Sequence, residues 1–270
     1  MRAPPCKWNE EELEILKRYY PYCTNDEVLQ MLPSKKLRQV VEKAHHMGIK
    51  KHYDVRRKIT GKAMRKHKIN EDFFKTWSHN QAYILGFIYA DGHLDPNSYR
   101  LSLVIKDLDL LQSINRAMGS EYPILRDAST KRYYALYICS MTIYNDLVSI
   151  GLVQNKKDIK YPNVPDEFKP SFVRGFFDGD GSVSLRWNSR DIINTEFVSS
   201  SIDFLKGLHN DIKAYAGVHG GSLKKVKWAN AYRLRYGHYD SIKLGCWMYS
   251  TNGIYLKRKW EVFQLARNSS

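Results

Sequence analysis

The sequence predicts an α+β protein in which two pseudo-symmetric αββαββα repeats follow a small N-terminal domain of three helices. Residues 82–92 (AYILGFIYADG) and 171–181 (SFVRGFFDGDG) are nearly the same apolar run, and short segments of alternating apolar and polar residues follow both. Residues 1–50 instead contain short helical stretches divided by cap and turn signals. The predicted domains are therefore 1–50, 51–71, 72–160 and 161–270.

The N-terminal domain is expected to contain three short helices. The acidic residues of EEELEILKRYY, after Asn9, suit a first helical turn, and Thr24 is a suitable cap for the second helix. The third helix, KKLRQVVEKAHHMG, follows Pro33 and ends at Gly48. Its expected buried stripe consists of Leu37, Val40, Val41 and Ala44.

Three short helices with a basic third helix resemble a Myb/SANT-like helix-turn-helix module. The resemblance implies that the third helix enters the major groove of DNA. The residues expected to contact DNA lie largely off the buried stripe: Lys35, Lys36, Arg38, Gln39 and Lys43. The alternative is a three-helix scaffold with a solvated basic face.

Residues 51–71 are predicted to be a basic linker. The stretch 50–68 (KKHYDVRRKITGKAMRKHK) carries nine Lys and Arg residues against one Asp. Arg56 and Arg57 are candidate phosphate contacts, because each neutralised phosphate adds salt-dependent affinity. A solvated tether is the alternative.

Each repeat is expected to begin with its apolar helix and to continue through two strand pairs. In residues 72–160 the strands are predicted within HLDPNSYRLSLVI, EYPILRD and RYYALYICS, with a helix at KDLDLLQSINRAMG and another through Ile150. In residues 161–270 they are predicted within SVSLRWN, INTEFVSSS, SLKKVKW and YRLRYGH, with a helix at IDFLKGLHNDIKAYAG. A final helix and the loop NGIYLKRKW complete the second repeat.

Gly86 and Gly175 stand in the middle of the two apolar helices. A glycine costs about 1 kcal/mol there relative to alanine, so it is expected where two backbones approach closely. The two helices are therefore predicted to pack against each other, with Asp91 and Asp180 as neighbours at their ends. Either run alone also fits a core helix that stops at an Asp-Gly turn, and the second copy argues against that alternative.

Two carboxylates held side by side repel each other unless a cation lies between them. Hard oxygen ligands favour Mg²⁺ over zinc or copper. Two carboxylates with phosphate oxygens are a common setting for metal-assisted phosphodiester hydrolysis. Asp91 and Asp180 are therefore the candidate metal ligands and catalytic residues.

The two runs resemble the signature of the LAGLIDADG homing endonucleases in their single-chain, two-repeat form. Residues 173–181 are close to the pattern, while 84–92 depart from it at Tyr89, and the resemblance covers roughly residues 72–262. It implies a monomeric, site-specific double-strand DNA endonuclease, whose two sheets form a saddle over a long asymmetric site. It also implies cleavage across the minor groove with 3′ overhangs, and two or more Mg²⁺ ions that Mn²⁺ can replace.

The resemblance implies supporting residues around the two acids. The carbonyls of Ala90 and Gly179 are expected to complete the metal coordination. A lysine is expected near each centre, by loop position Lys156 and Lys257, with Lys157 and Lys259 as competitors. A further polar position aligns with Ile105 and Ser199, and Lys106 substitutes for Ile105 if the register differs by one residue.

Period-two alternation separates the two faces of each sheet and predicts which polar side chains face a duplex. These residue types suit base edges in a major groove, and a solvated sheet face is the alternative. The expected DNA contacts are His93, Asp95, Arg100, Ser102, Ser182, Ser184, Arg186, Asn188, Asn194, Glu196, Lys225, Lys227, Arg233 and Arg235.

Composition favours a polyanionic partner. Lys and Arg number 43 against 28 acidic residues, a net charge of +15, and no stretch of 18 apolar residues predicts a membrane span. The start, MRAPPCKWNEEE, lacks a secretory signal, which predicts an intracellular, cytoplasmic protein. The four scattered cysteines are expected to be reduced thiols.

Three other functions compete with an endonuclease. The first is a non-cleaving nucleic-acid-binding protein on the same fold, either a maturase that binds the RNA of its encoding intron or a transcription regulator. The second is an intein, which the NSS ending of the chain disfavours. The third is an HNH nuclease at His45-His46 or His79-Asn80, and a lone dipeptide is weak support for it.

Overall fold

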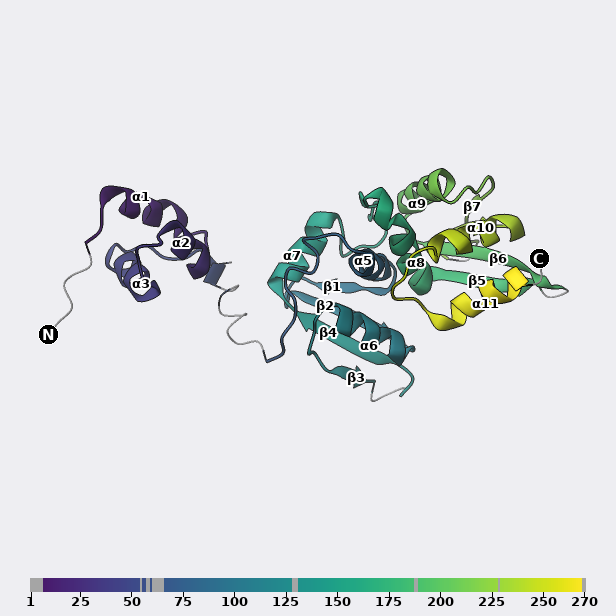
Figure 1. The fold of residues 1–270 in the computed structure, drawn as a ribbon, viewed down its shortest axis with the longest axis horizontal. Helices are drawn as coiled ribbons and strands as arrows, with labels where there is room; N and C mark the ends of the chain where they lie inside the picture. The colour runs from purple at the N-terminus through teal and green to yellow at the C-terminus, as the bar shows by residue number, and fades with distance from the viewer. Residues whose placement is uncertain are drawn as a thin grey trace. The chain divides into compact units, whose positions relative to one another are not determined.

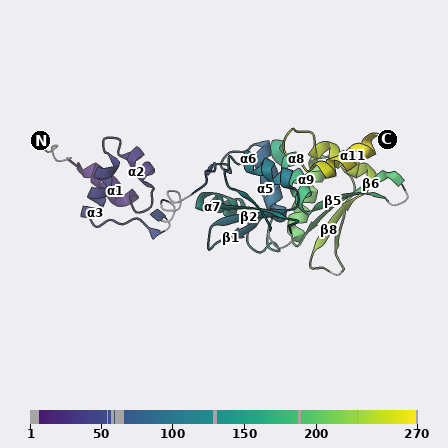
Figure 2. The ribbon, with the colours of Figure 1, turned by 90° about the horizontal axis from the view of Figure 1, so that it is seen from below.

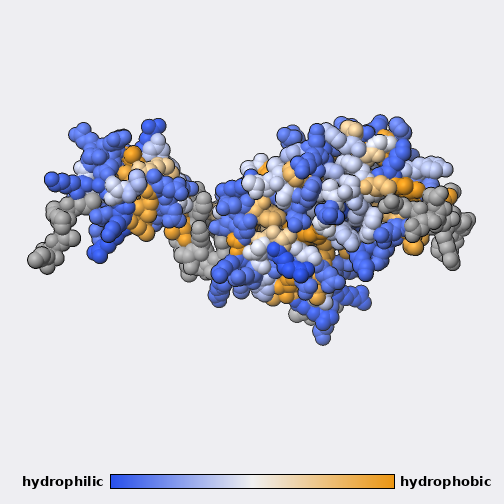
Figure 3. All heavy atoms as spheres, viewed as in Figure 1, coloured by the Kyte–Doolittle hydropathy of each residue, from blue (hydrophilic) through white to orange (hydrophobic). Residues whose placement is uncertain are grey.

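The computed structural model describes residues 7–53, 55–56, 59, 66–127, 131–186, 189–227 and 229–268. The chain divides into two compact units, Met1–Lys66 and His67–Ser270. Arg57 and Asn188 lie outside the described residues. On the face shown in Figure 3, hydrophilic residues cover most of the surface of both units. Among the described residues, no helix has both the length and the apolar character to cross a membrane.

The first unit contains three helices, α1 (Glu10–Tyr19), α2 (Asn25–Met31) and α3 (Leu37–His46). Asn9 and Thr24 cap the first two in reciprocal capping boxes with Glu12 and Glu27. The helices share a small core formed by Leu16, Tyr20, Val28, Leu32, Val40 and Ala44. The predicted stripe of α3 is half correct: Leu37 and Val41 are exposed, because only one narrow side of this short helix meets α1 and α2.

The second unit begins with an αββαββα arrangement. Its elements are α5 (His79–Asp91), β1 (His93–Asp95), β2 (Arg100–Ile105), α6 (Leu108–Ala117), β3 (Ile124–Arg126), β4 (Tyr134–Cys139) and α7 (Met141–Ile150). The strands form one antiparallel sheet in the order β1-β2-β4-β3.

The same order of elements recurs after a short 3-10 helix, η1 (Asp166–Phe168). The elements are α8 (Lys169–Asp180), β5 (Gly181–Arg186), β6 (Ser189–Ser199), α9 (Ile202–Tyr215), β7 (Ser222–Lys225), β8 (Tyr232–Tyr236) and α10 (His238–Met248). Their antiparallel sheet has the order β5-β6-β8-β7, which matches the first sheet strand for strand. Figure 2 shows the helices of the second unit mainly on one side of the two sheets.

The end of the chain differs from the sequence-based expectation. After the loop that follows α10, residues Lys257–Asn268 form a further helix, α11, where only a loop was predicted. Its apolar residues are few, but Phe263 and Ala266 are buried in the main core. The helix is held by these tertiary contacts, and its polar sequence gave little periodic signal.

Helices α5 and α8 pack against each other at the centre of the second unit, between the two sheets (Figure 1). A Cβ on Gly86 would lie 2.0 Å from the Phe172 carbonyl oxygen, and one on Gly175 would lie 1.9 Å from that of Tyr83. Real Cβ atoms do not approach so closely, so only glycine fits at these two crossing points. The predicted close approach of the two helices is confirmed.

Candidate metal and nucleic-acid site

The carboxylates of Asp91 and Asp180 are brought together by the helix pair. Each is the last residue of its helix and is followed by an extended glycine that leads into the first strand of its repeat. The helix ends touch, because a Cβ on Gly179 would lie 2.4 Å from the Ala90 Cβ and 3.2 Å from Asp91 Oδ2. The predicted neighbourhood of the two acids is therefore present in the structure.

The protein around the two carboxylates favours their neutral form. Burial, together with the negative charge of Asp91, raises the pKa of Asp180 to about 6. The pKa of Asp91 is also raised by desolvation, although this residue keeps exposed surface where the helix ends. Lys156 and Lys259 oppose both shifts without cancelling them. Two like charges that lack full compensation are a favourable setting for a cation.

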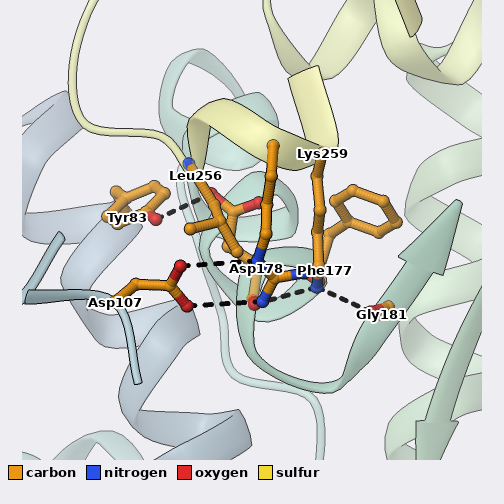
Figure 4. A network of polar contacts seen from close by, with 8 residues as sticks. Tyr83, Asp107, Phe177, Asp178, Gly181, Leu256 and Lys259 are labelled. Atoms are coloured by element: carbon orange, nitrogen blue, oxygen red, sulfur yellow. Dashed lines mark hydrogen bonds and ion pairs between the residues drawn. The ribbon is translucent and has the colours of Figure 1, made fainter. Parts of the chain in front are cut away.

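Two lysines complete the cluster, one from each repeat. The Lys156 ammonium donates to the carbonyl oxygen of Ala90. Lys259 is 6% exposed, and its ammonium donates to the carbonyls of Phe177 at 2.6 Å, Asp178 at 2.9 Å and Gly181 at 2.6 Å (Figure 4). Burial lowers the pKa of both lysines, that of Lys259 to about 8.

The predicted second lysine, Lys257, is not in the cluster. Its side chain is 84% exposed and lies 3.9 Å from Glu261. Lys259 is two residues further along the first turn of α11, and this rotation about the helix axis turns it inward. Lys157, the other competitor, is exposed.

The residue two places before each acid anchors the segment that leads to each lysine. In the second repeat, Asp178 Oδ2 accepts hydrogen bonds from the Leu256 amide at 2.7 Å and from the Tyr83 hydroxyl at 2.7 Å (Figure 4). In the first repeat, Tyr89 donates its hydroxyl to the Ile150 carbonyl at 3.3 Å. At this position the second repeat therefore has a hydrogen-bond acceptor, Asp178, whereas the first repeat has a donor, Tyr89. Burial raises the pKa of Asp178 to about 6.

Sequence reasoning missed the role of Arg174. This arginine is 1% exposed, and its guanidinium donates to the carbonyls of Met248 at 2.9 Å and Thr251 at 2.8 Å. It therefore fixes the start of the loop that leads to α11. A charged residue inside an apolar helix, where the first repeat has Leu85, was the available signal.

The further polar position predicted by the family resemblance differs between the repeats. Ile105 is buried against the core, whereas the Ser199 hydroxyl accepts from the Ser201 amide at 3.1 Å. Lys106 is exposed and lines a cavity of about 200 Å³ with Asp91 and Asp107. Asp107 also pairs with Arg258 of α11 through two contacts of 3.4 Å, which links the two repeats beside the acids.

The chemistry of these donors fits a divalent cation that shares its coordination sphere with other ligands. Among the described residues, no group of three or more His, Cys, Asp or Glu side chains surrounds a common point. The protein therefore offers two carboxylates and backbone carbonyls, which leaves positions for water or phosphate. The Ala90 carbonyl is already bound to Lys156, so a cation there requires this ammonium to move. Gly179 lies against Ala90 and Asp91 at the other helix end, and the role of its carbonyl as a metal ligand stays a prediction.

The strand registers place most predicted DNA contacts on one face of each sheet. Opposed residues share a face, and the pairs include His93 with Ser102, Asp95 with Arg100, and Ser182 with Glu196. Asn194 opposes Ser184, and Arg235 opposes Glu196. Ser102 is buried, whereas His93, Ser182, Ser184, Arg233 and Arg235 are exposed. Arg186 closes β5, and its side chain lies outside the described residues.

One predicted strand contact lies on the wrong face. Lys225 opposes Tyr232, whereas Lys224 opposes Arg233 and shares the face of the arginines. Because a shift of one residue reverses the direction of a strand side chain, Lys224 takes the position that was assigned to Lys225. Lys227 is exposed in the loop after β7.

In the N-terminal unit, Lys35 is part of the scaffold and not of a free basic face. Its side chain is 7% exposed, lies 2.9 Å from Glu12 and stands over the Trp8 ring. Gln39 accepts from the Lys36 amide at 2.8 Å, and Arg38 pairs with Glu42 at 2.7 Å. Lys36, Arg38 and Arg56 are exposed, and Lys43 is half-buried.

The second unit has the LAGLIDADG fold, as its similarity to solved structures shows. The homing endonuclease I-WcaI, solved bound to its DNA recognition sequence, superposes with a TM-score of 0.51 at 12% identity over 72% of this chain and 91% of that chain. Variants of the homing endonuclease I-DmoI superpose with a TM-score of 0.48 at 15% identity, over 70% of this chain and 97% of that chain. The N-terminal LAGLIDADG domain of WhiA superposes with a TM-score of 0.46 at 17% identity, over 68% of this chain and 90% of that chain. No protein-family model and no curated protein matches the sequence.

Because Lys259 lies in the cluster and the predicted Lys257 does not, the two lysines provide a matched pair of variants. Lys259→Met should lower the free energy of unfolding by about 1–3 kcal/mol, because it leaves buried carbonyls without a donor. It should also weaken any cleavage activity. Lys257→Met should change neither quantity, since that side chain lies in water. Urea unfolding of the two variants tests the assignment, and equal effects would contradict it.

Proposed function

We propose that the chain is a site-specific double-strand DNA endonuclease that hydrolyses phosphodiester bonds with a divalent metal. The observation that carries the proposal is the pair of acids at two touching helix ends, with raised pKa values and a lysine from each repeat beside them. The fold likeness to I-WcaI, which was solved bound to its DNA recognition sequence, supports a DNA partner.

Asp91 and Asp180 would hold the metal, and Mg²⁺ or Mn²⁺ suits their oxygen ligands. When bound, the ion would polarise the scissile phosphate, lower the pKa of water and neutralise the leaving 3′ oxygen. Lys156 and Lys259 would contribute positive charge beside the phosphate. Cleavage of two phosphates, one on each strand and facing each other across the minor groove, would leave 3′ overhangs.

The two sheets would hold the duplex as a saddle through their exposed polar faces. Because one chain carries both repeats, the protein is proposed to act as a monomer on a long asymmetric site. The N-terminal unit, a helix-turn-helix module in this proposal, and the basic residues after it would extend the footprint along the DNA.

The direct test is incubation of the full chain with a randomised duplex library in Mg²⁺, followed by sequencing of the cut ends. The proposal expects one long site, cut on both strands, in Mg²⁺ and not in EDTA. Binding to a defined site without any cut would contradict it. That outcome would favour the non-cleaving alternative, which the Lys156 ammonium on the Ala90 carbonyl also supports.

We expect metal binding to depend on pH near 6. Asp180, whose pKa is about 6, takes up a proton as the pH falls to 5, and this proton competes with the metal. Ca²⁺ should therefore raise Tm at pH 7.5 but not at pH 5, and Asp180→Asn should remove the rise. A rise of equal size at both pH values would contradict the assignment.

Without metal, the contribution of Asp180 to the free energy of unfolding should fall as the pH rises from about 4 to about 6, because the folded chain holds this proton more tightly than the unfolded chain.

Deletion of residues 1–66 should weaken DNA binding and flatten its salt dependence. Each lost phosphate contact lowers the slope of log affinity against log salt by about 0.9. The deletion ends at the boundary between the compact units and keeps Lys68, whose carbonyl accepts from the Glu121 amide in the second unit. Fluorescence anisotropy at several salt concentrations measures both effects. An unchanged slope would exclude the N-terminal unit as a DNA-binding module.

A further inference from the structure

The two sheets can be compared position by position. Ile105 of β2 opposes Tyr134, and Ser199 of β6 opposes Tyr232, so these pairs occupy equivalent places. Counting along the strands from these pairs makes three positions of the free face equivalent. They are Ala135 with Arg233, Tyr137 with Arg235, and Leu125 with Lys224.

The free face of the first sheet is largely apolar at these positions. Leu125 is 49% exposed and Tyr137 is 37% exposed, although both lie on the side of the sheet away from the core. The one strand cation on this face, among the described residues, is Arg100. It lies 3.7 Å from Asp95 and over the Tyr137 ring at 5.2 Å, so its charge is locally neutralised.

The free face of the second sheet is cationic at the equivalent positions. Lys224, Arg233 and Arg235 are all exposed. The two arginines lie 3.7 Å and 3.2 Å from Glu196, which holds their guanidinium groups side by side. The strand position just before Ile105 and Ser199 does not contribute to the difference, because Val104 and Val198 occupy it and are both exposed.

We propose that the two repeats recognise DNA half-sites of different chemistry, an inference that rests on the proposed DNA-binding function. The first sheet would contact thymine methyl groups through Leu125 and Tyr137, since the C5 methyl is the apolar group that a base pair presents in the major groove. The second sheet reads guanine O6 and N7 with Arg233 and Arg235, and it supplies most of the phosphate attraction through Lys224.

A duplex is the occupant that both faces fit together. The apolar positions of the first sheet are the register equivalents of the cationic positions of the second, so both faces belong to one proposed interface. A protein partner would be expected to cover the apolar face alone. A protein partner is therefore not needed to explain why Leu125 and Tyr137 are exposed.

The test replaces thymine by deoxyuridine, which removes only the methyl group. Binding of the full chain to its selected site is measured in Ca²⁺, so that cleavage is not required. Deoxyuridine in the half-site bound by the first sheet should weaken binding by about fourfold for each methyl group removed from contact. Deoxyuridine in the half-site bound by the second sheet should have no effect. Leu125→Ala combined with Tyr137→Ala should abolish the sensitivity of the half-site bound by the first sheet, and Lys224→Ala, the matched control, should leave it unchanged.

Salt dependence provides the complementary measurement. Lys224→Ala should lower the salt slope by about 0.9, and Leu125→Ala should not change it. Arg233→Ala and Arg235→Ala should each weaken the preference for guanine by about tenfold. Equal deoxyuridine effects in both halves, no effect in either half, or sensitivity that survives the combined Leu125→Ala and Tyr137→Ala variant would overturn the inference. DNA binding with these signatures but without cleavage in Mg²⁺ would overturn the proposed nuclease function and leave the inference standing. Absence of DNA binding would overturn both.

Discussion

Asp180→Asn should abolish double-strand cleavage while DNA binding in Ca²⁺ stays close to that of the unchanged chain. Asparagine keeps the size of the side chain but removes the charge that would hold the metal beside Asp91. Loss of several kcal/mol of metal-derived stabilisation of the transition state corresponds to a fall in rate of about a thousandfold or more. The measurement is the single-turnover rate on the selected site in Mg²⁺.

The control removes a carboxylate elsewhere in the same repeat. Asp203→Asn changes the same functional group on α9, where the side chain is 70% exposed and pairs with Lys206. It should leave the rate unchanged. A rate of Asp180→Asn within tenfold of the unchanged chain would contradict the assignment of Asp180 as a metal ligand.

Gly86→Ala and Gly175→Ala should each destabilise the second unit by about 3 kcal/mol or more. The added methyl groups would lie 2.0 Å and 1.9 Å from backbone carbonyl oxygens of the facing helix, and backbone can yield only if the helices separate. Separation would also move Asp91 away from Asp180. Urea unfolding should therefore show a lower midpoint, and cleavage by the folded fraction should be impaired as well.

Gly237→Ala is the matched control for these variants. No atom lies within 4 Å of its hypothetical Cβ, and its φ of −77° suits any residue. It should shift the free energy of unfolding by less than about 1 kcal/mol, a loss due only to alanine being a poorer N-cap of α10 than glycine. Stability of Gly86→Ala equal to that of Gly237→Ala would contradict the close packing of α5 and α8.

The central helix pair was predictable because its signal is local and repeated. A glycine in an apolar helix is unfavourable by itself, so its presence in both copies pointed to close packing. Strand faces were predictable in most places for a similar reason, since alternation is visible in any few residues. Lys225 failed because the prediction depended on the register of a four-residue strand, and an error of one position reverses the face.

The remaining differences involve partners that are distant in the chain. Lys35 carries a charge typical of a solvated helix, but Glu12, more than twenty residues earlier, holds it inside the scaffold. Lys259 differs from Lys257 only in its angle around α11, and that helix is stabilised by the core. Arg174 fixes carbonyls more than seventy residues away. No short pattern contains such pairings, which arise only when segments that are distant in the chain pack together.

The central claim is that Asp91 and Asp180 act as one divalent-metal centre. Its most direct test is titration of Mn²⁺ into the full chain bound to duplex DNA, with free Mn²⁺ followed by its EPR signal. We predict saturable binding above that of DNA alone, which Asp91→Asn combined with Asp180→Asn removes. Equal Mn²⁺ binding by the unchanged chain and the double variant would contradict the account.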